Sequence, residues 1–191
     1  MPAVALLAVL AFAEFCLLLR RKWPRFGSAW RILCLLAGMA VIAFGLWALV
    51  EIAFRHGNVV LLYVVAIVKF SDVGGFAFGI SSARLMKGGN HKLCPSVSPG
   101  KSWEGLFGSV FLSCAVSCAF MPFTGFSAGK ALAFGAAAAL LGTAGDLVES
   151  RFKRWVGVKD SSTMMITNGM GGVLDMLDSL LIAPAALAPF I

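Results

Sequence analysis

Long apolar segments are the feature of this sequence that most restricts its fold. Of its 191 residues, 60% are hydrophobic and 13% charged, whereas soluble proteins average about 45–50% apolar and about 25% charged residues. A helix needs about 20 apolar residues to cross a bilayer core about 30 Å thick. The segments predict an all-α fold, a polytopic membrane helix bundle with about six transmembrane helices. Their approximate ranges are 2–19, 32–50, 58–80, 105–123, 131–149 and 171–190.

Basic residues are distributed unevenly among the connections between these segments. Thirteen Lys and Arg residues lie in the first, third and fifth connections, whereas only Arg55 and Lys130 lie in the second and fourth. Short loops rich in Lys and Arg stay on the cytoplasmic side. We therefore expect those three connections to be cytoplasmic and both termini to face outward. The first segment has no positive charge before it, so we expect a retained membrane helix rather than a signal peptide.

The net charge of +7 does not indicate a nucleic-acid partner. A nucleic-acid-binding protein gathers its basic side chains on one soluble face, whereas here they are divided among short loops beside apolar segments. Anionic lipid head groups attract such loops, so we expect membrane lipids as partners. The five cysteines form no CxxC pair, and we interpret them as small packing residues.

Carboxylates are few and carry most of the functional information. A charge inside a bilayer costs about 2.5–3.5 kcal/mol or more, and it persists mainly where it has a partner or a function. Asp146 with Glu149, and Asp175 with Asp178, are each spaced three residues apart, so both members of a pair share a helix face. The two pairs lie in the fifth and sixth segments, which a cytoplasmic connection joins. Both pairs are therefore expected toward the same side of the membrane.

Carboxylates gathered in this way repel one another unless a cation lies among them. A hard ion such as Mg²⁺ prefers a few carboxylate oxygens together with phosphates and water, and the pattern therefore predicts a metal site. The alternative is structural. In that case the first pair forms ion pairs with the basic residues that follow it, and the second pair caps the last helix.

Two further segments suit a phosphorylated ligand. The basic stretch 151–160 lies between the two acidic pairs, and Gly169, Gly171 and Gly172 allow the backbone to approach a ligand before a helix begins. Gly100-Lys101-Ser102 imitates the end of a P-loop, but Pro95 stands where glycine is needed and no preceding strand is predicted. We interpret this turn as a phosphate cradle with one lysine.

Lys69 and Asp72 lie three residues apart inside the third apolar segment and can pair with each other. The sequence leaves open whether this pair is structural or functional, and Lys69 is the one partner it offers for Asp72. His56 and His91 lie in loops without ligand-like spacing, which favours solvated side chains.

At these residues the sequence resembles the phosphatidate cytidylyltransferases, also called CDP-diacylglycerol synthases. Their Gly-Asp-Leu-x-Glu-Ser element is matched at 145–150, and their Ser-Pro-x-Lys-Thr-Trp-Glu-Gly element at 98–105. The resemblance predicts one membrane-embedded cytidylyltransferase-like domain over 1–191, with a motif-bearing core at about 70–180. The longer family signature appears as Ser150, Lys153-Arg154, Lys159-Asp160, the glycines 169–172, Asp175 and Asp178.

The resemblance implies transfer of a cytidylyl group from CTP to phosphatidate, giving CDP-diacylglycerol and pyrophosphate for phospholipid biosynthesis. It implies a bacterial inner-membrane enzyme whose site faces the cytoplasm and whose cofactor is Mg²⁺. The metal ligands it implies are Asp146, Asp175 and Asp178, which with Lys153 are also the catalytic residues. The substrate-binding residues it implies are Ser98, Lys101, Lys153, Arg154, Lys159, Gly171 and Gly172.

This sequence departs from the family pattern in the glycine-rich turn and in length. Met170 stands where the family has histidine, and a thioether neither donates a proton nor carries charge. The chain is shorter than typical members, and we expect it to lack some amino-terminal helices. A homodimer is compatible with the polar surface that a short bundle must enclose.

Two other function classes remain alternatives. A CTP-dependent kinase of polyprenol or dolichol type, or an isoprenoid-lipid cytidylyltransferase, would use a similar site with another acceptor. An anion transporter also gathers charges near helix ends. The transporter is less favoured because the sequence has no repeated halves and its charges lie toward one face of the membrane.

Overall fold

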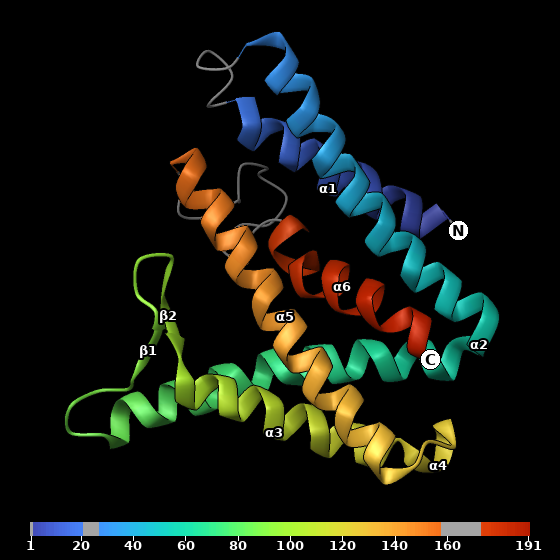
Figure 1. The fold of residues 1–191 in the computed structure, drawn as a ribbon, viewed down its shortest axis with the longest axis vertical. Coiled ribbons are helices and arrows are strands. Elements are labelled where there is room, and N and C mark those ends of the chain that lie inside the picture. Colours follow the sequence, from blue (N-terminus) through green and yellow to red (C-terminus); the bar gives the residue numbers. More distant parts are fainter. Residues whose placement is uncertain (1, 21–26, 158–172) are drawn as a thin grey trace.

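The structure is a computed structural model that describes residues 2–20, 27–157 and 173–191. Most of these residues are helical (Figure 1), and a helix occupies each predicted apolar segment. The all-helical prediction is therefore right for the bundle, and one short hairpin is the exception. The elements are α1 (Pro2–Arg20), α2 (Ser28–Leu85), β1 (Lys92–Cys94), β2 (Ser98–Ser102), α3 (Trp103–Ala119), α4 (Met121–Thr124), α5 (Ala128–Val156), α6 (Val173–Leu187) and the 3-10 turn η3 (Ala188–Phe190).

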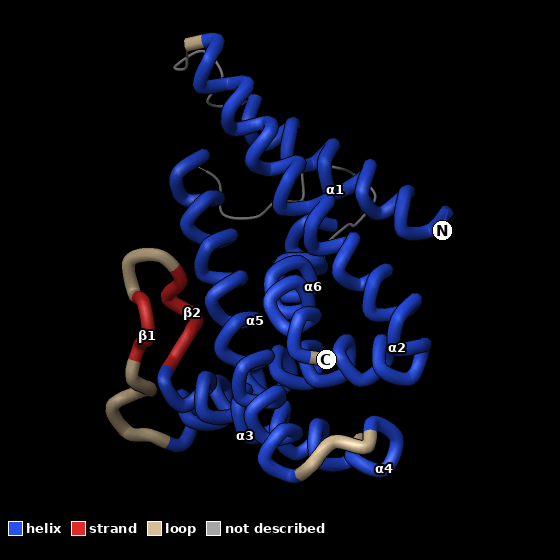
Figure 2. The backbone as a smooth tube through the Cα atoms, turned by 45° about the vertical axis from the view of Figure 1, so that its right-hand side comes forward, coloured by secondary structure: helices blue, strands red, loops and turns tan. Residues whose placement is uncertain are grey.

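The second and third predicted segments join into the bent helix α2. Gly57 has φ +83° and ψ 172°, outside the helical region, and the chain changes direction there. A positive φ is readily adopted only by glycine, which explains why the bend falls at this residue. Figure 2 shows the consequence, because the half of α2 after the bend runs beside α3 while the first half runs beside α1.

Two helices are long and apolar enough to cross a membrane, as judged by length and composition within the described residues. They cover Ala29–Leu85 in α2 and Ala128–Trp155 in α5, whereas Trp103–Ala119 and Ser179–Phe190 are apolar but shorter. Large apolar side chains also cover the outside, with Phe54 71% and Phe76 72% exposed. A surface of this kind suits contact with lipid tails rather than water.

Among the residues that the structure describes, the interior holds two apolar clusters and a set of interhelical hydrogen bonds. One cluster joins the second half of α2 to α5 and α6, and the other joins α1 to α6 and the first half of α2. The buried Tyr63 hydroxyl lies 2.8 Å from Ser117 Oγ, and Ser113 Oγ donates to the carbonyl of Ile67 at 3.0 Å. These bonds tie α3 to α2 where water does not compete.

Glycines allow α2 and α3 to approach most closely next to the site described below. A Cβ built on Gly74 would lie 2.3 Å from the carbonyl oxygen of Gly108. Because that atom belongs to the backbone, the two helices would have to separate to accept even a methyl group. The close contact therefore fixes the distance between the two helices that frame the site.

We predict that Gly74→Ala lowers the free energy of unfolding by about 1–3 kcal/mol, the usual cost of overpacking. Gly129→Ala is the matched control, because Gly129 lies in the first turn of α5 with no atom within 4 Å of a built Cβ. The control should be neutral or slightly stabilising. Unfolding in detergent measures both, and equal stability of the two variants would contradict the close contact.

Candidate active site

A β-hairpin, not an irregular turn, leads into α3. Strands β1 and β2 pair antiparallel, with Lys92 opposite Ser102 and Cys94 opposite Ser98. The sequence analysis predicted no strand here, and that expectation was wrong. Ser102 ends β2 and caps α3, because its Oγ accepts a hydrogen bond from the backbone N–H of Gly105 at 3.1 Å.

The first turn of α3 holds the start of the hairpin. The backbone N–H of His91 donates to both carboxylate oxygens of Glu104 at 3.2 Å, and His91 Nδ1 lies 2.6 Å from Glu104 Oε1. The hydrogen bond with this imidazole holds the pKa of Glu104 below its ordinary value. His91 is thus exposed, as expected, but it also anchors the hairpin to α3.

Helix α5 holds the other side of the hairpin at two points. Lys101 Nζ, from β2, donates to Asp146 Oδ2 at 2.5 Å. About two turns further along α5, Arg154 Nε donates to the carbonyl of Val97 at 3.4 Å. The side chains of Lys101 and Asp146 are only 24% and 26% exposed, which strengthens their attraction relative to a pair in water. The two motifs that the sequence analysis assigned to one site therefore meet in the structure.

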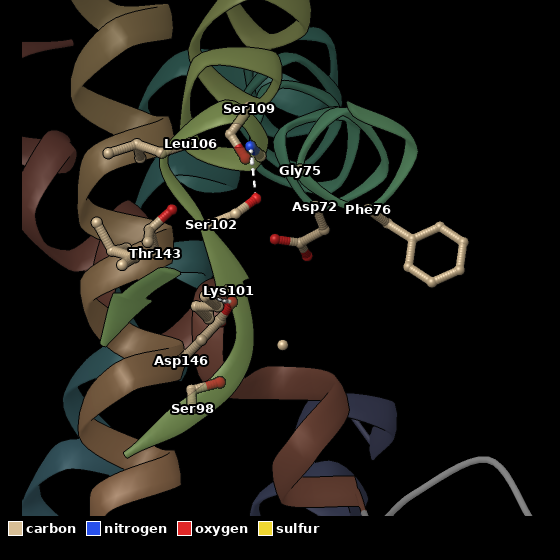
Figure 3. Close-up of a pocket in the computed structure, with 13 residues that line it drawn as sticks. Asp72, Gly75, Phe76, Ser98, Lys101, Ser102, Leu106, Ser109, Thr143 and Asp146 are labelled. Atoms are coloured by element: carbon tan, nitrogen blue, oxygen red, sulfur yellow. Dashed lines mark hydrogen bonds and ion pairs between the residues drawn. The ribbon is translucent and has the colours of Figure 1, made fainter. Parts of the chain in front are cut away.

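A cavity of about 350 Å³ lies where the hairpin meets α2, α3 and α5, and we call it the polar cavity because charged and hydroxyl side chains are part of its lining. Figure 3 shows the carboxylates of Asp72 and Asp146 entering it from two helices, with Lys101 beside them and the ring of Phe76 turned away. Hydroxyl groups complete the polar wall. They belong to Ser98, Ser102, Ser109 and Thr143.

Asp72 is a site residue that the sequence analysis did not select. Lys69 Nζ donates to Asp72 Oδ2 at 3.2 Å, which confirms the predicted pair. Lys69 is not its one partner, however, because Ser179 Oγ of α6 also donates to Asp72 Oδ2 at 3.1 Å. Lys69 Nζ donates to Ser179 Oγ as well, at 3.1 Å. This three-residue group links α2 to α6 and orients the Asp72 carboxylate at the cavity.

Part of the predicted basic loop belongs to a helix. Helix α5 continues to Val156 and ends at Gly157, which has φ +86°. Lys153 and Arg154 therefore lie in its last turns, and Lys153 Nζ lies 3.4 Å from Glu149 Oε2. The structural alternative of ion pairing with the following basic residues thus holds for Glu149.

Several residues expected in the site lie beyond what the structure describes. Asp175 and Asp178 lie in the first turns of α6, three residues apart, but their side chains are outside the described set. Lys159, Asp160 and the glycine-rich turn 169–172, with Met170, fall in the range that is not described. The structure therefore neither gathers nor separates these residues and Asp146.

The described part of the cavity offers two carboxylates of the kind that hold Mg²⁺ together with phosphates. Among the described residues no group of three or more His, Cys, Asp or Glu side chains is close enough to hold a metal alone. Mg²⁺ commonly uses one or two protein carboxylates and completes its coordination with substrate phosphates and water. Asp72 and Asp146 supply two carboxylates to one cavity.

Comparison with known sequences shows the family to which this chain belongs. The whole chain, residues 1–191, matches the cytidylyltransferase family, and the protein belongs to that family. Relatives called phosphatidate cytidylyltransferase occur in Staphylococcus aureus strain COL, 41% identical over 121 residues, and in Haemophilus influenzae, 39% identical over 136 residues. A third, from Staphylococcus saprophyticus, is 37% identical over 148 residues.

The alignments cover more of this chain than of its relatives. They include 62%, 65% and 76% of this chain but 44%, 43% and 53% of the three relatives. The chain thus spans about half the length of the curated relatives it matches.

We predict that Ser179→Ala lowers the free energy of unfolding by about 0.6–1.7 kcal/mol, between the average and the maximum measured for hydrogen bonds between membrane helices. Turnover should fall too, because Asp72 loses a donor that orients it. Ser81→Ala is the control, since Ser81 is exposed on α2 and does not line the polar cavity. Unfolding and activity assays in detergent test both variants. Wild-type behaviour of Ser179→Ala would mean that the link to α6 contributes nothing.

Proposed function

We propose that this protein transfers the cytidylyl group of CTP to phosphatidate, giving CDP-diacylglycerol and pyrophosphate for phospholipid biosynthesis. The observation that carries the proposal is the polar cavity, where Lys101 and Asp146 meet next to Asp72. Family membership and the activity named for the relatives support the same reaction.

The reaction requires positioning and charge neutralisation more than a general base. A phosphate oxygen of phosphatidate forms a bond to the α-phosphorus of CTP, and the bond from that phosphorus to the bridging oxygen breaks. The electron pair leaves with pyrophosphate. Because the attacking phosphate is already anionic, the site has to align two anions and offset their repulsion.

Basic residues around the cavity supply part of that offset. Lys101 lies in the cavity, held by Asp146, while Lys153 and Arg154 lie in the last turns of α5. We assign these three to substrate phosphates, with Lys159, Gly171 and Gly172 as further donors from the range beyond α5. The Ser98 hydroxyl lines the same cavity and provides a neutral donor.

We assign the cofactor as Mg²⁺, because this ion prefers a few carboxylate oxygens together with substrate phosphates and water. Asp146 and Asp72 would hold it from the described side, and Asp175 and Asp178 from the start of α6. When bound, the ion supplies charge stabilisation for phosphate oxygens and for the leaving group.

The membrane arrangement remains part of the proposal. The helices α1, α3, α5, α6 and the two halves of α2 would make about six crossings of a bacterial inner membrane. The excess of Lys and Arg in alternate connections favours a cytoplasmic position for the hairpin and for the site. A homodimer stays a prediction.

Isotope labelling separates cytidylyl transfer from the kinase alternative. We predict that CTP labelled at the α-phosphorus passes its label to phosphatidate, while label at the γ-phosphorus leaves as pyrophosphate. Purified protein in detergent with Mg²⁺, followed by separation of lipid and soluble products, gives the measurement. Lipid labelled only from the γ position would establish a kinase, and absence of lipid label from both positions would overturn cytidylyl transfer to phosphatidate.

Substitution of the cavity carboxylates tests their assignment. We predict that Asp146→Asn and Asp72→Asn each lower turnover about 100-fold, as when one preorganised charge partner is lost. The loss of turnover in Asp72→Asn would be larger than expected for a residue that only pairs with Lys69. Glu51→Gln is the control, because Glu51 is also a helix carboxylate in an ion pair, with Arg55, but is outside the cavity. Turnover across a Mg²⁺ titration measures the effect, and near-normal activity of either Asp variant at low Mg²⁺ would remove it from the site.

A further inference from the structure

A second cavity of about 350 Å³ lies on the other side of α5 and is almost entirely apolar. It is enclosed by α1, the first half of α2, α5 and α6, and the function proposed above does not use it. Phe15 and Phe152 form part of its wall as a stacked pair with ring centroids 5.2 Å apart. Val41 and Val148, at its rim, are 52% and 63% exposed, so the cavity opens sideways from the bundle.

Helix α5 is the common wall of the polar and apolar cavities. Gly145, Val148, Phe152 and Trp155 follow one another at intervals of three and four residues and line the apolar cavity. Asp146, the next residue after Gly145, lines the polar one. An apolar stripe and a polar stripe of residues therefore lie side by side along α5.

A buried ion pair lies at the boundary between these two stripes. Glu149 lines the apolar cavity, and its carboxylate pairs with Lys153. Their side chains are only 10% and 13% exposed. Lys153 follows Asp146 by seven residues, which places it on the same helix face about 10 Å away. A cation is thus held between an apolar cavity and the polar site.

We propose that the apolar cavity binds one acyl chain of the lipid substrate, with the lipid phosphate on the Lys153 side of α5. This inference rests on the proposed function, because phosphatidate is the anionic lipid in question. A phospholipid joins an anionic phosphate to acyl chains through a short glycerol unit, so its site needs an apolar cavity next to a cation. The cavity volume is at the lower end of ligand pockets, about 300–1,000 Å³, and suits part of one chain.

Charge complementarity distinguishes this occupant from the surrounding lipid. An acyl chain of any bilayer lipid can contact the exposed apolar faces of the bundle, such as the one formed by Phe107 and Phe111. The cavity on α5 differs because Lys153 offers a charged donor to a phosphate monoester, which carries more negative charge than the phosphodiester of a zwitterionic lipid. Selectivity for phosphatidate is the expected signature.

Photo-crosslinking of the full chain in nanodiscs tests the proposal. The probes are a phosphatidate and a phosphatidylcholine that carry the same diazirine-tipped acyl chain. Phosphatidate should label the peptides containing Phe15 and Phe152 several-fold more than phosphatidylcholine does. Val148→Trp fills the rim and should lower that labelling about fourfold for each methylene group displaced. Leu140→Trp, at a position of α5 that is 53% exposed and lies outside the cavity, should leave it unchanged.

A double variant tests the ion pair without leaving either member alone. Glu149→Gln with Lys153→Met should remove the preference for phosphatidate while leaving the apolar cavity in place. Equal labelling by both probes in the unsubstituted protein, or unchanged labelling in Val148→Trp, would overturn the proposal.

Turnover measured on the same samples distinguishes a failure of the acyl-chain site from a failure of the proposed function. Cytidylyl transfer with unselective labelling would overturn the acyl-chain site and leave the proposed function standing. Selective labelling without transfer from CTP would support the lipid site and overturn the proposed function.

Discussion

A carboxylate in an apolar helix bundle has to lie close to a cation, because an isolated buried charge is far costlier than a paired one. Where the two partners belong to different elements, as Lys101 and Asp146 do, charge neutralisation also fixes how those elements are placed. The Lys101 pair attaches the hairpin to α5 over a separation of 45 residues in sequence. The pairs are Lys69 with Asp72, Lys101 with Asp146 and Lys153 with Glu149.

Hydropathy and residue spacing predicted most of the fold but less of the site. The apolar segments become helices because backbone groups in an apolar environment must bond internally, and the Ser-Pro-Gly-Lys-Ser motif meets Asp146 as the motif pattern suggested. Asp72 was missed because Lys69, three residues away on the same helix, already provided a partner for its charge. Its bond to Ser179 joins positions 107 residues apart, and no local pattern reports such a contact.

Two predictions of secondary structure were wrong, at the hairpin and at the end of α5, and each error has a local cause. The hairpin 92–102 lacks the alternating apolar pattern of a strand, and its pairing is held by contacts with α3 and α5 rather than by a buried face. The end of α5 was assigned to a loop because it is charged. Lys and Arg are good helix formers, however, and they interact favourably with the carboxyl end of a helix dipole, so α5 continues through them to Val156.

The cap at Ser102 has a consequence for how the chain tolerates insertions and deletions. Lys101 immediately precedes the residue that caps α3, and His91 is bonded to Glu104 in the first turn of that helix. The hairpin is therefore anchored at both ends, and one added residue would shift Lys101 away from Asp146. The length of the hairpin should accordingly be fixed, so the geometry of the polar site depends on the spacing of these residues as well as on their identity.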